Sequence, residues 1–127
     1  MVKHSVWGES MRVGVVVNRS IPDGRRVKIH VYIRNRRTGD VRLVDKQSGI
    51  PPCCAINFDC SSDDIIIIRT SVEHISLPIV MKGYHTDVIP ANTLKLGKKY
   101  MMRTWQARFP FNLVIKTGCI YTIARVE

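Results

Sequence analysis

Apolar and polar residues alternate along several short stretches of this chain. The clearest is Val27–Arg34, in which valine or isoleucine takes every odd position and a polar or aromatic residue every even one. A period of two with many β-branched side chains is typical of a strand with one buried face. The connection that follows contains Gly39, at a point where a positive φ is needed, and predicts a hairpin. In its second strand we expect Val41 and Leu43 on one face and Arg42 on the other.

The rest of the chain shows similar alternation or continuous aliphatic runs. Strands are predicted at residues 11–18, 65–70, 72–80, 98–106 and 119–126, with turns at residues 21–24 and 82–83. The stretch 53–58 is a candidate for a short edge strand. No segment has a sustained apolar period of 3.6 residues. Seven to nine short strands separated by turn signals predict an all-β sandwich or barrel.

The chain is expected to form one domain over residues 1–127, because this length buries a sizeable core without disulfides or metal. Residues 1–10 are expected to be a lead-in segment. Residues 47–64 are expected to be a long loop, since Gly49, Pro51-Pro52 and the polar run Ser61–Asp64 interrupt the alternation. Long loops within compact domains often carry function, so this loop is a candidate specificity element.

The charge balance is strongly basic. The formal net charge is +10, and residues 1–50 hold eleven of the Lys and Arg residues and only four of the Asp and Glu residues. A basic patch of this kind is the electrostatic signature of a polyanion binder. The alternative is a domain whose basic residues are merely its solvated surface.

One row of outward-facing residues combines charge with aromatic rings. Alternation places successive members about 7 Å apart, close to the spacing of successive phosphates in a single strand. Tyr32 and His30 are placed to stack on bases, although both could instead pack against a neighbouring strand. The candidates for polyanion binding are Arg25, Arg26, Lys28, His30, Tyr32, Arg34, Arg36, Arg37 and Arg42.

The four cysteines are Cys53, Cys54, Cys60 and Cys119. Three of them fall within eight residues, but the spacing lacks the C-x2-C pair of a zinc knuckle, so no metal site is predicted. If the protein is in an oxidising compartment, a disulfide between Cys54 and Cys60, or between Cys119 and one of the others, is one alternative. Reduced, partly buried thiols are the alternative, favoured where no export signal is visible.

No catalytic motif is visible. The chain has no HExxH, no Gly-rich phosphate loop and no Gly-x-Ser-x-Gly elbow, so we expect neither enzymatic activity nor a cofactor. The N-terminal residues lack the apolar region of a secretory signal, and the longest aliphatic run, Ile65–Ile68, is far too short to span a bilayer. A cytoplasmic protein without membrane association is therefore expected, with a mature or excised secreted domain as the alternative.

Three segments, Val27–Asn35, Leu94–Tyr100 and Gly118–Ile123, carry a resemblance to a known group. Their order resembles immunoglobulin-like sandwiches of the bacterial accessory type, similar to intracellular proteinase-inhibitor-like domains. The resemblance covers most of residues 11–126 and implies an immunoglobulin-like antiparallel β-sandwich with a non-enzymatic binding role. It departs from antibody-type domains, because no Cys–Trp–Cys framework is present.

Two functions follow as expectations. The first is an interaction or structural module that binds a protein partner or self-assembles, using an edge strand. The second is a nucleic-acid (polyanion) binding protein that uses the basic face of residues 25–42. Salt distinguishes them, because only the second loses affinity steeply as salt rises.

Overall fold

The structure, a computed structural model, describes residues 8–76, 79–108 and 115–127. Within these ranges the chain forms β-strands joined by short connections, and one 3-10 turn, η1 (Ala91–Thr93). The strands are β1 (Ser10–Ile21), β2 (Val27–Arg34), β3 (Val41–Gly49), β4 (Cys53–Ser61), β5 (Ile65–Ser76), β6 (Ile79–Pro90), β7 (Lys99–Arg108) and β8 (Ile115–Arg125). No helix among the described residues has the length and apolar content needed to cross a membrane.

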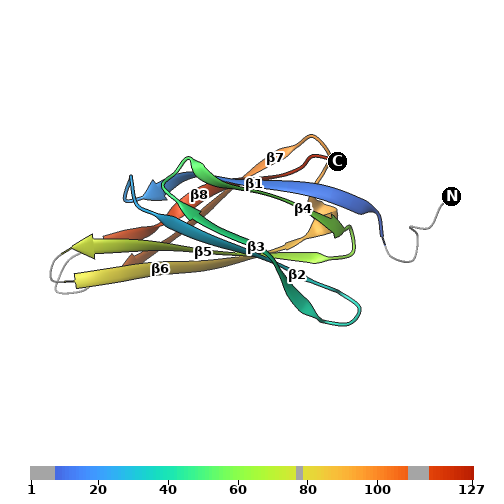
Figure 1. The fold of residues 1–127 in the computed structure, drawn as a ribbon, viewed down its shortest axis with the longest axis horizontal. Helices are drawn as coiled ribbons and strands as arrows, with labels where there is room; N and C mark the ends of the chain where they lie inside the picture. Colours follow the sequence, from blue (N-terminus) through green and yellow to red (C-terminus); the bar gives the residue numbers. More distant parts are fainter. Residues whose placement is uncertain (1–7, 77–78, 109–114) are drawn as a thin grey trace.

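The eight strands form two layers that face each other (Figure 1). One sheet has the strand order β4-β1-β8-β7 and the other has the order β3-β2-β5-β6. Every strand pairing is antiparallel. The predicted all-β antiparallel sandwich of seven to nine strands is therefore confirmed.

The alternation in the sequence explains which side chains meet between the layers. In β2 the odd-numbered residues from Val27 to Ile33 are buried, as predicted, and the even-numbered residues face outward. In β1 the buried set begins at Met11 and continues with every second residue to Val17. From β8 the largest contribution is Tyr121, whose side chain is completely buried. The core is thus a single cluster filled from both sheets.

The prediction of a long loop at residues 47–64 is wrong. β3 continues to Gly49, and β4 begins at Cys53, so only a short turn separates them. In β4 every second residue from Cys54 to Cys60 is buried. This stretch therefore has the period of two expected for a strand, although the neighbouring Pro-Pro and Ser-Ser pairs obscure it in the sequence.

Several other predicted boundaries also change. The predicted strand at residues 72–80 is divided, because β5 ends at Ser76 and β6 begins at Ile79. The predicted turn at Lys82-Gly83 lies inside β6, and the strand predicted at residues 119–126 is β8, which already begins at Ile115. Of the predicted lead-in segment, residues 1–7 lie outside the described residues, and β1 already begins at Ser10.

The β2–β3 hairpin forms as predicted, but the first residues of β3 project from the opposite face of the sheet to the one predicted. Gly39 has a φ of +77°, which its missing side chain permits. The register shifts between Val31 and Tyr32, a β-bulge, so that Tyr32 pairs with Leu43. Paired residues share a face, and Leu43 therefore lies on the outer face with 47% of its surface exposed. Val41 and Leu43 thus lie on the polar side of the sheet, whereas Val44, at the bulge, packs against the core.

Candidate functional site

The outer face of the β3-β2-β5-β6 sheet gathers polar side chains from strands that are far apart in sequence. The pairing of β2 with β5 places His30 opposite Arg69 and Lys28 opposite Ser71. The pairing of β5 with β6 then places Ser71 opposite Tyr84. Because paired residues project from the same face, the outward row of β2 is extended by residues of β5 and β6.

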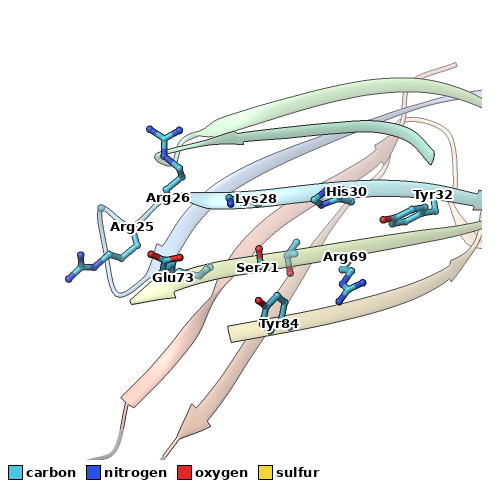
Figure 2. Close-up of a pocket in the computed structure, with 12 residues that line it drawn as sticks. Arg25, Arg26, Lys28, His30, Tyr32, Arg69, Ser71, Glu73 and Tyr84 are labelled. Carbon is cyan, nitrogen blue, oxygen red and sulfur yellow. The ribbon is translucent and has the colours of Figure 1, made fainter. Parts of the chain in front are cut away.

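These side chains surround a cavity of about 600 Å³, which we call the basic groove (Figure 2). It runs along β2 and β5 from the β1–β2 turn. Its lining residues are Gly24, Arg25, Arg26, Lys28, His30, Tyr32, Arg69, Thr70, Ser71, Val72, Glu73 and Tyr84.

The groove carries an excess of positive charge. Among the described side chains that line it, the cations are those of Arg25, Arg26, Lys28 and Arg69, and the one carboxylate is that of Glu73. Lys28 is exposed on the outward side of β2, and Arg26, which directly precedes this strand, is exposed as well. A concave surface lined by one sign of charge concentrates the field and attracts ligands of the opposite charge. The groove is therefore suited to an anion with several charges.

Aromatic rings lie among these cations. The rings of His30 and Tyr32 are nearly parallel, with an interplanar angle of 12° and centroids 6.3 Å apart. Across the groove the guanidinium of Arg69 lies 5.8 Å from the ring centroid of Tyr84, which is 43% exposed. Flat π surfaces beside a guanidinium are the groups on which unpaired bases stack.

A smaller hollow of about 300 Å³ continues the basic surface across β2 toward β3. Lys46 of β3 lines it and lies opposite His30 in the register. Lys28 and His30 line both cavities, so the two are continuous along β2. The cationic surface thus extends beyond the groove itself.

The predicted polyanion-binding residues are only partly brought together. Five of them line the basic groove, namely Arg25, Arg26, Lys28, His30 and Tyr32. The other four do not line it, namely Arg34, Arg36, Arg37 and Arg42. Arg42 pairs with the buried Ile33, so it projects from the opposite face of the sheet. Its inclusion in the outward row is therefore wrong, because the bulge in β3 reverses its side.

Arg36 and Arg37 lie in the β2–β3 turn, at the far end of β2 from Arg25. The length of β2 separates the two ends by roughly 23 Å. At the β2–β3 turn the Arg37 guanidinium is 4.0 Å from the carboxylate of Asp63. These two arginines form part of a separate surface.

Sequence reasoning missed Arg69, Tyr84 and Lys46. Four isoleucines precede Arg69, and a continuous aliphatic run of this kind is typical of a strand covered on both faces. Arg69 is nevertheless exposed, and Ile67 on the same side is only half-buried. A charged residue at the end of an aliphatic run is the signal that one face of this strand meets solvent.

The four cysteines are all free. Cys54 and Cys60 both project inward from β4, six residues apart, which along an extended strand is roughly 20 Å. A disulfide needs Cα atoms about 4.4–6.8 Å apart, so the Cys54–Cys60 pairing, one of the alternatives for an oxidising compartment, is incompatible with this strand. The described residues contain no group of three His, Cys, Asp or Glu residues placed to hold a metal ion.

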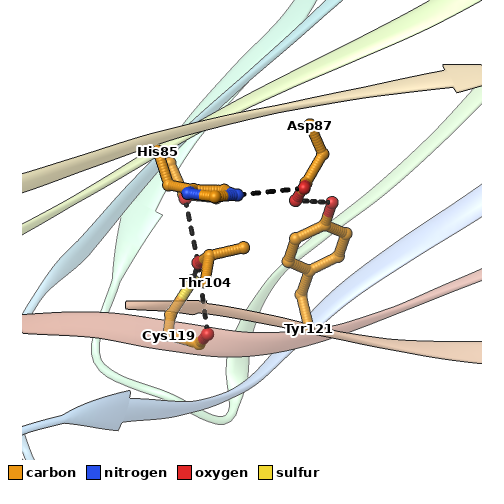
Figure 3. A network of polar contacts seen from close by, with 6 residues as sticks. His85, Asp87, Thr104, Cys119 and Tyr121 are labelled. Carbon is orange, nitrogen blue, oxygen red and sulfur yellow. Dashed lines mark hydrogen bonds and ion pairs between the residues drawn. The ribbon is translucent and has the colours of Figure 1, made fainter. Parts of the chain in front are cut away.

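A polar network lies inside the sandwich near β6 and β8 (Figure 3). The Tyr121 hydroxyl donates to Asp87 Oδ2 at 2.5 Å, and His85 Nε2 lies 3.0 Å from Asp87 Oδ1. Close by, the Thr104 hydroxyl donates to the carbonyl of Cys119 at 3.2 Å. These contacts satisfy polar groups that would otherwise be buried without partners. The network supports the fold and lies on the inner side of the sheet, away from the basic groove.

The buried thiols and Tyr121 make the fold sensitive to alkali. Burial, followed by the nearby Asp64 and Asp59, raises the pKa of Cys60 from 9.0 to about 11. Burial first, and then the hydrogen bond to Asp87, raises the pKa of Tyr121 above its ordinary value of 10.0. A raised pKa stabilises the fold below the unfolded-state value, and this contribution is lost as pH rises through the folded-state value.

We therefore expect the free energy of unfolding to fall above about pH 9, by up to about 1.4 kcal/mol per pH unit for each such group. Urea unfolding with a reductant, measured from neutral pH to about pH 11, checks this. The Cys60→Ala variant should show a shallower decline. An unchanged decline would mean that the Cys60 thiol does not contribute.

No protein-family model matches this chain, and no curated protein matches it. Among solved structures, a C2 domain of plant extended synaptotagmin 1 is similar over 92% of this chain and 95% of that one, with 9% sequence identity and a TM-score of 0.47. A likeness this distant carries no argument about function. The resemblance to proteinase-inhibitor-like domains stays a prediction.

Proposed function

We propose that this chain is a non-enzymatic binding module that holds single-stranded nucleic acid in the basic groove. The observation that carries the proposal is the coincidence, in one cavity, of four cationic side chains and three exposed or half-exposed rings. Cations alone suit any polyanion, whereas rings beside them suit a polyanion that also presents unpaired bases.

The spacing along β2 supports a strand that lies lengthwise in the groove. Lys28, His30 and Tyr32 project from one face at intervals of about 7 Å. A backbone that follows this row places phosphates near Lys28 and Arg69 and turns its bases toward the rings of Tyr32 and Tyr84. In a duplex the bases are stacked on one another and unavailable to those rings, so single strands are the expected ligand.

Fluorescence anisotropy of a labelled 20-nucleotide single strand, titrated with the protein over a range of salt concentrations, tests the proposal. If the four groove cations each contact a phosphate, the logarithm of the association constant falls with the logarithm of salt with a slope of about −2.8. Affinity should then drop about 50-fold between 50 and 200 mM salt.

Polyphosphate of matched charge is the control ligand, because it offers phosphates without bases. We expect it to compete more weakly than the unlabelled single strand, since stacking contributes about 1–3 kcal/mol per base. If polyphosphate competes as well as the unlabelled single strand, the groove binds polyanions without recognising bases. No binding of the single strand at low salt would overturn the proposal.

A protein partner is the second candidate, and the outer side of β3 favours it. β3 is at the end of its sheet, and its outward residues Val41 and Leu43 are 54% and 47% exposed. An edge strand with exposed apolar side chains is able to pair with a strand of another chain. Absence of nucleic-acid binding, together with self-association that persists at high salt, would favour this function.

A further inference from the structure

Two thiols meet at the start of β4. The Sγ atoms of Cys53 and Cys54 lie 2.8 Å apart, and both residues are free cysteines. Consecutive residues of a regular strand point to opposite faces, which holds adjacent side chains apart. The closeness of the two sulfurs therefore needs a local departure from strand geometry.

The backbone at Cys54 provides that departure. Cys54 has a φ of +60°, and within the described part of the chain no other residue except glycine has a positive φ. The β1–β4 register shifts between Val15 and Val17, so Cys54 and Ala55 together oppose a single residue of β1. This is a β-bulge, which redirects one side chain. Here it turns the Cys54 sulfur toward that of Cys53.

Gly49, the last residue of β3, makes room for both sulfurs. A Cβ atom on Gly49 would lie 3.2 Å from the Cys53 sulfur and 3.8 Å from the Cys54 sulfur. The pair thus lies directly against the glycine backbone. Cys54 is only 7% exposed, whereas Cys53 is half-buried. A dissolved reagent therefore reaches the Cys53 sulfur first.

We propose that Cys53 and Cys54 form a site of reversible oxidation, which low-molecular-weight disulfides convert to a disulfide between the two adjacent residues. The Cys53 thiolate attacks one sulfur of oxidised glutathione, whose S–S bond breaks and releases one reduced glutathione. The Cys54 thiol then loses its proton to solvent, and its sulfur attacks that of Cys53 and displaces the second glutathione. Two electrons pass from the protein to glutathione.

The adjacency of the two residues makes this disulfide reversible. Neighbouring Cα atoms are about 3.8 Å apart, whereas ordinary disulfides join Cα atoms about 4.4–6.8 Å apart. A disulfide outside the ordinary range stores strain and is reduced more easily, as labile and regulatory disulfides are. The site therefore suits cycles of oxidation and reduction rather than permanent cross-linking.

The pKa of Cys54 affects the second step. Burial first, and then the hydrogen bond with Cys53, raises it to about 12, while Arg26 acts to lower it. The thiolate is the reacting species, so closure of the disulfide should accelerate as pH rises toward that value.

The test is incubation of the folded, full-length chain with oxidised glutathione, followed by an acid quench and mass spectrometry of its peptides. The peptide that contains Cys53 and Cys54 should lose two hydrogen atoms, and dithiothreitol should restore them. Cys60 and Cys119 should stay free for alkylation. The Cys60→Ala variant is the matched control and should behave as the parent chain, whereas Cys53→Ser should form no such disulfide.

Three results would overturn the proposal. These are a glutathione adduct on Cys53 that never closes at raised pH, a disulfide that includes Cys119 instead, and closure at the same rate in the urea-unfolded chain. The last result would show that the bulge in β4 does not position the two sulfurs. None of these measurements involves nucleic acid, so the inference stands or fails independently of the proposed function.

Discussion

Reversing the charge of Lys28 and Arg69 together, as Lys28→Glu and Arg69→Glu, should weaken binding of a labelled single strand at least about 25-fold at 0.1 M salt. Each phosphate contact on a single strand adds about 0.7 to the salt slope, which corresponds to about fivefold in affinity between 1 M and 0.1 M salt. Loss of two contacts multiplies these factors and makes the slope shallower by about 1.4. Anisotropy titrations across salt measure both quantities.

Lys99→Glu with Arg103→Glu is the matched control. Both residues are exposed on β7, in the other sheet, and the change in net charge is identical. Charges farther away than the Debye length, about 8 Å at physiological salt, are largely screened, so this pair should leave binding nearly unchanged. An equal loss in both double variants would show that net charge, and not the basic groove, determines binding. Circular dichroism verifies that each variant is folded.

The sequence predicts most of the fold because burial here follows a simple period of two. In Val27–Arg34 each odd residue is buried, and no turn residue interrupts the pattern. The same period exists in β4, but the Pro-Pro pair before it and the run of Ser and Asp residues at its end are residues that usually mark loops. Local turn propensity and strand periodicity conflict at this point, and tertiary packing decides in favour of the strand.

The candidate site is less predictable, because it depends on register between strands. The outward row of β2 is visible in the sequence, whereas Arg69 and Tyr84 join it only through pairings with residues far along the chain. Arg42, by contrast, is wrongly included in the outward row when only the sequence is considered. One extra residue in β3 moves its side chain to the other face, and alternation alone does not reveal a bulge.

Gly118→Ala should destabilise the fold by about 3 kcal/mol or more, at the upper end of what adding one carbon to a packed site costs. A Cβ on Gly118 would overlap the Thr104 carbonyl oxygen and Trp105 Cα, and would lie 2.7 Å from Trp105 Cβ. The first two atoms belong to the backbone of β7, so no rotation of a side chain relieves the overlap. Either β7 moves away from β8 or the pairing breaks where Trp105 faces Gly118.

Gly14→Ala is the control, because Gly14 also lies within a strand of the same sheet. Its Cβ would approach only the side-chain oxygen of Asn57, at 3.0 Å, and the Val126 side chain, at 4.0 Å. The amide of Asn57 is exposed and able to rotate away, and alanine restricts the unfolded chain more than glycine does, so this variant should lose little stability. Urea unfolding followed by circular dichroism compares the two variants. Similar unfolding midpoints for the two variants would contradict this prediction. They would show that β7 can move away from an added methyl group at little cost, so the close approach of β7 to β8 would not explain the glycine at position 118.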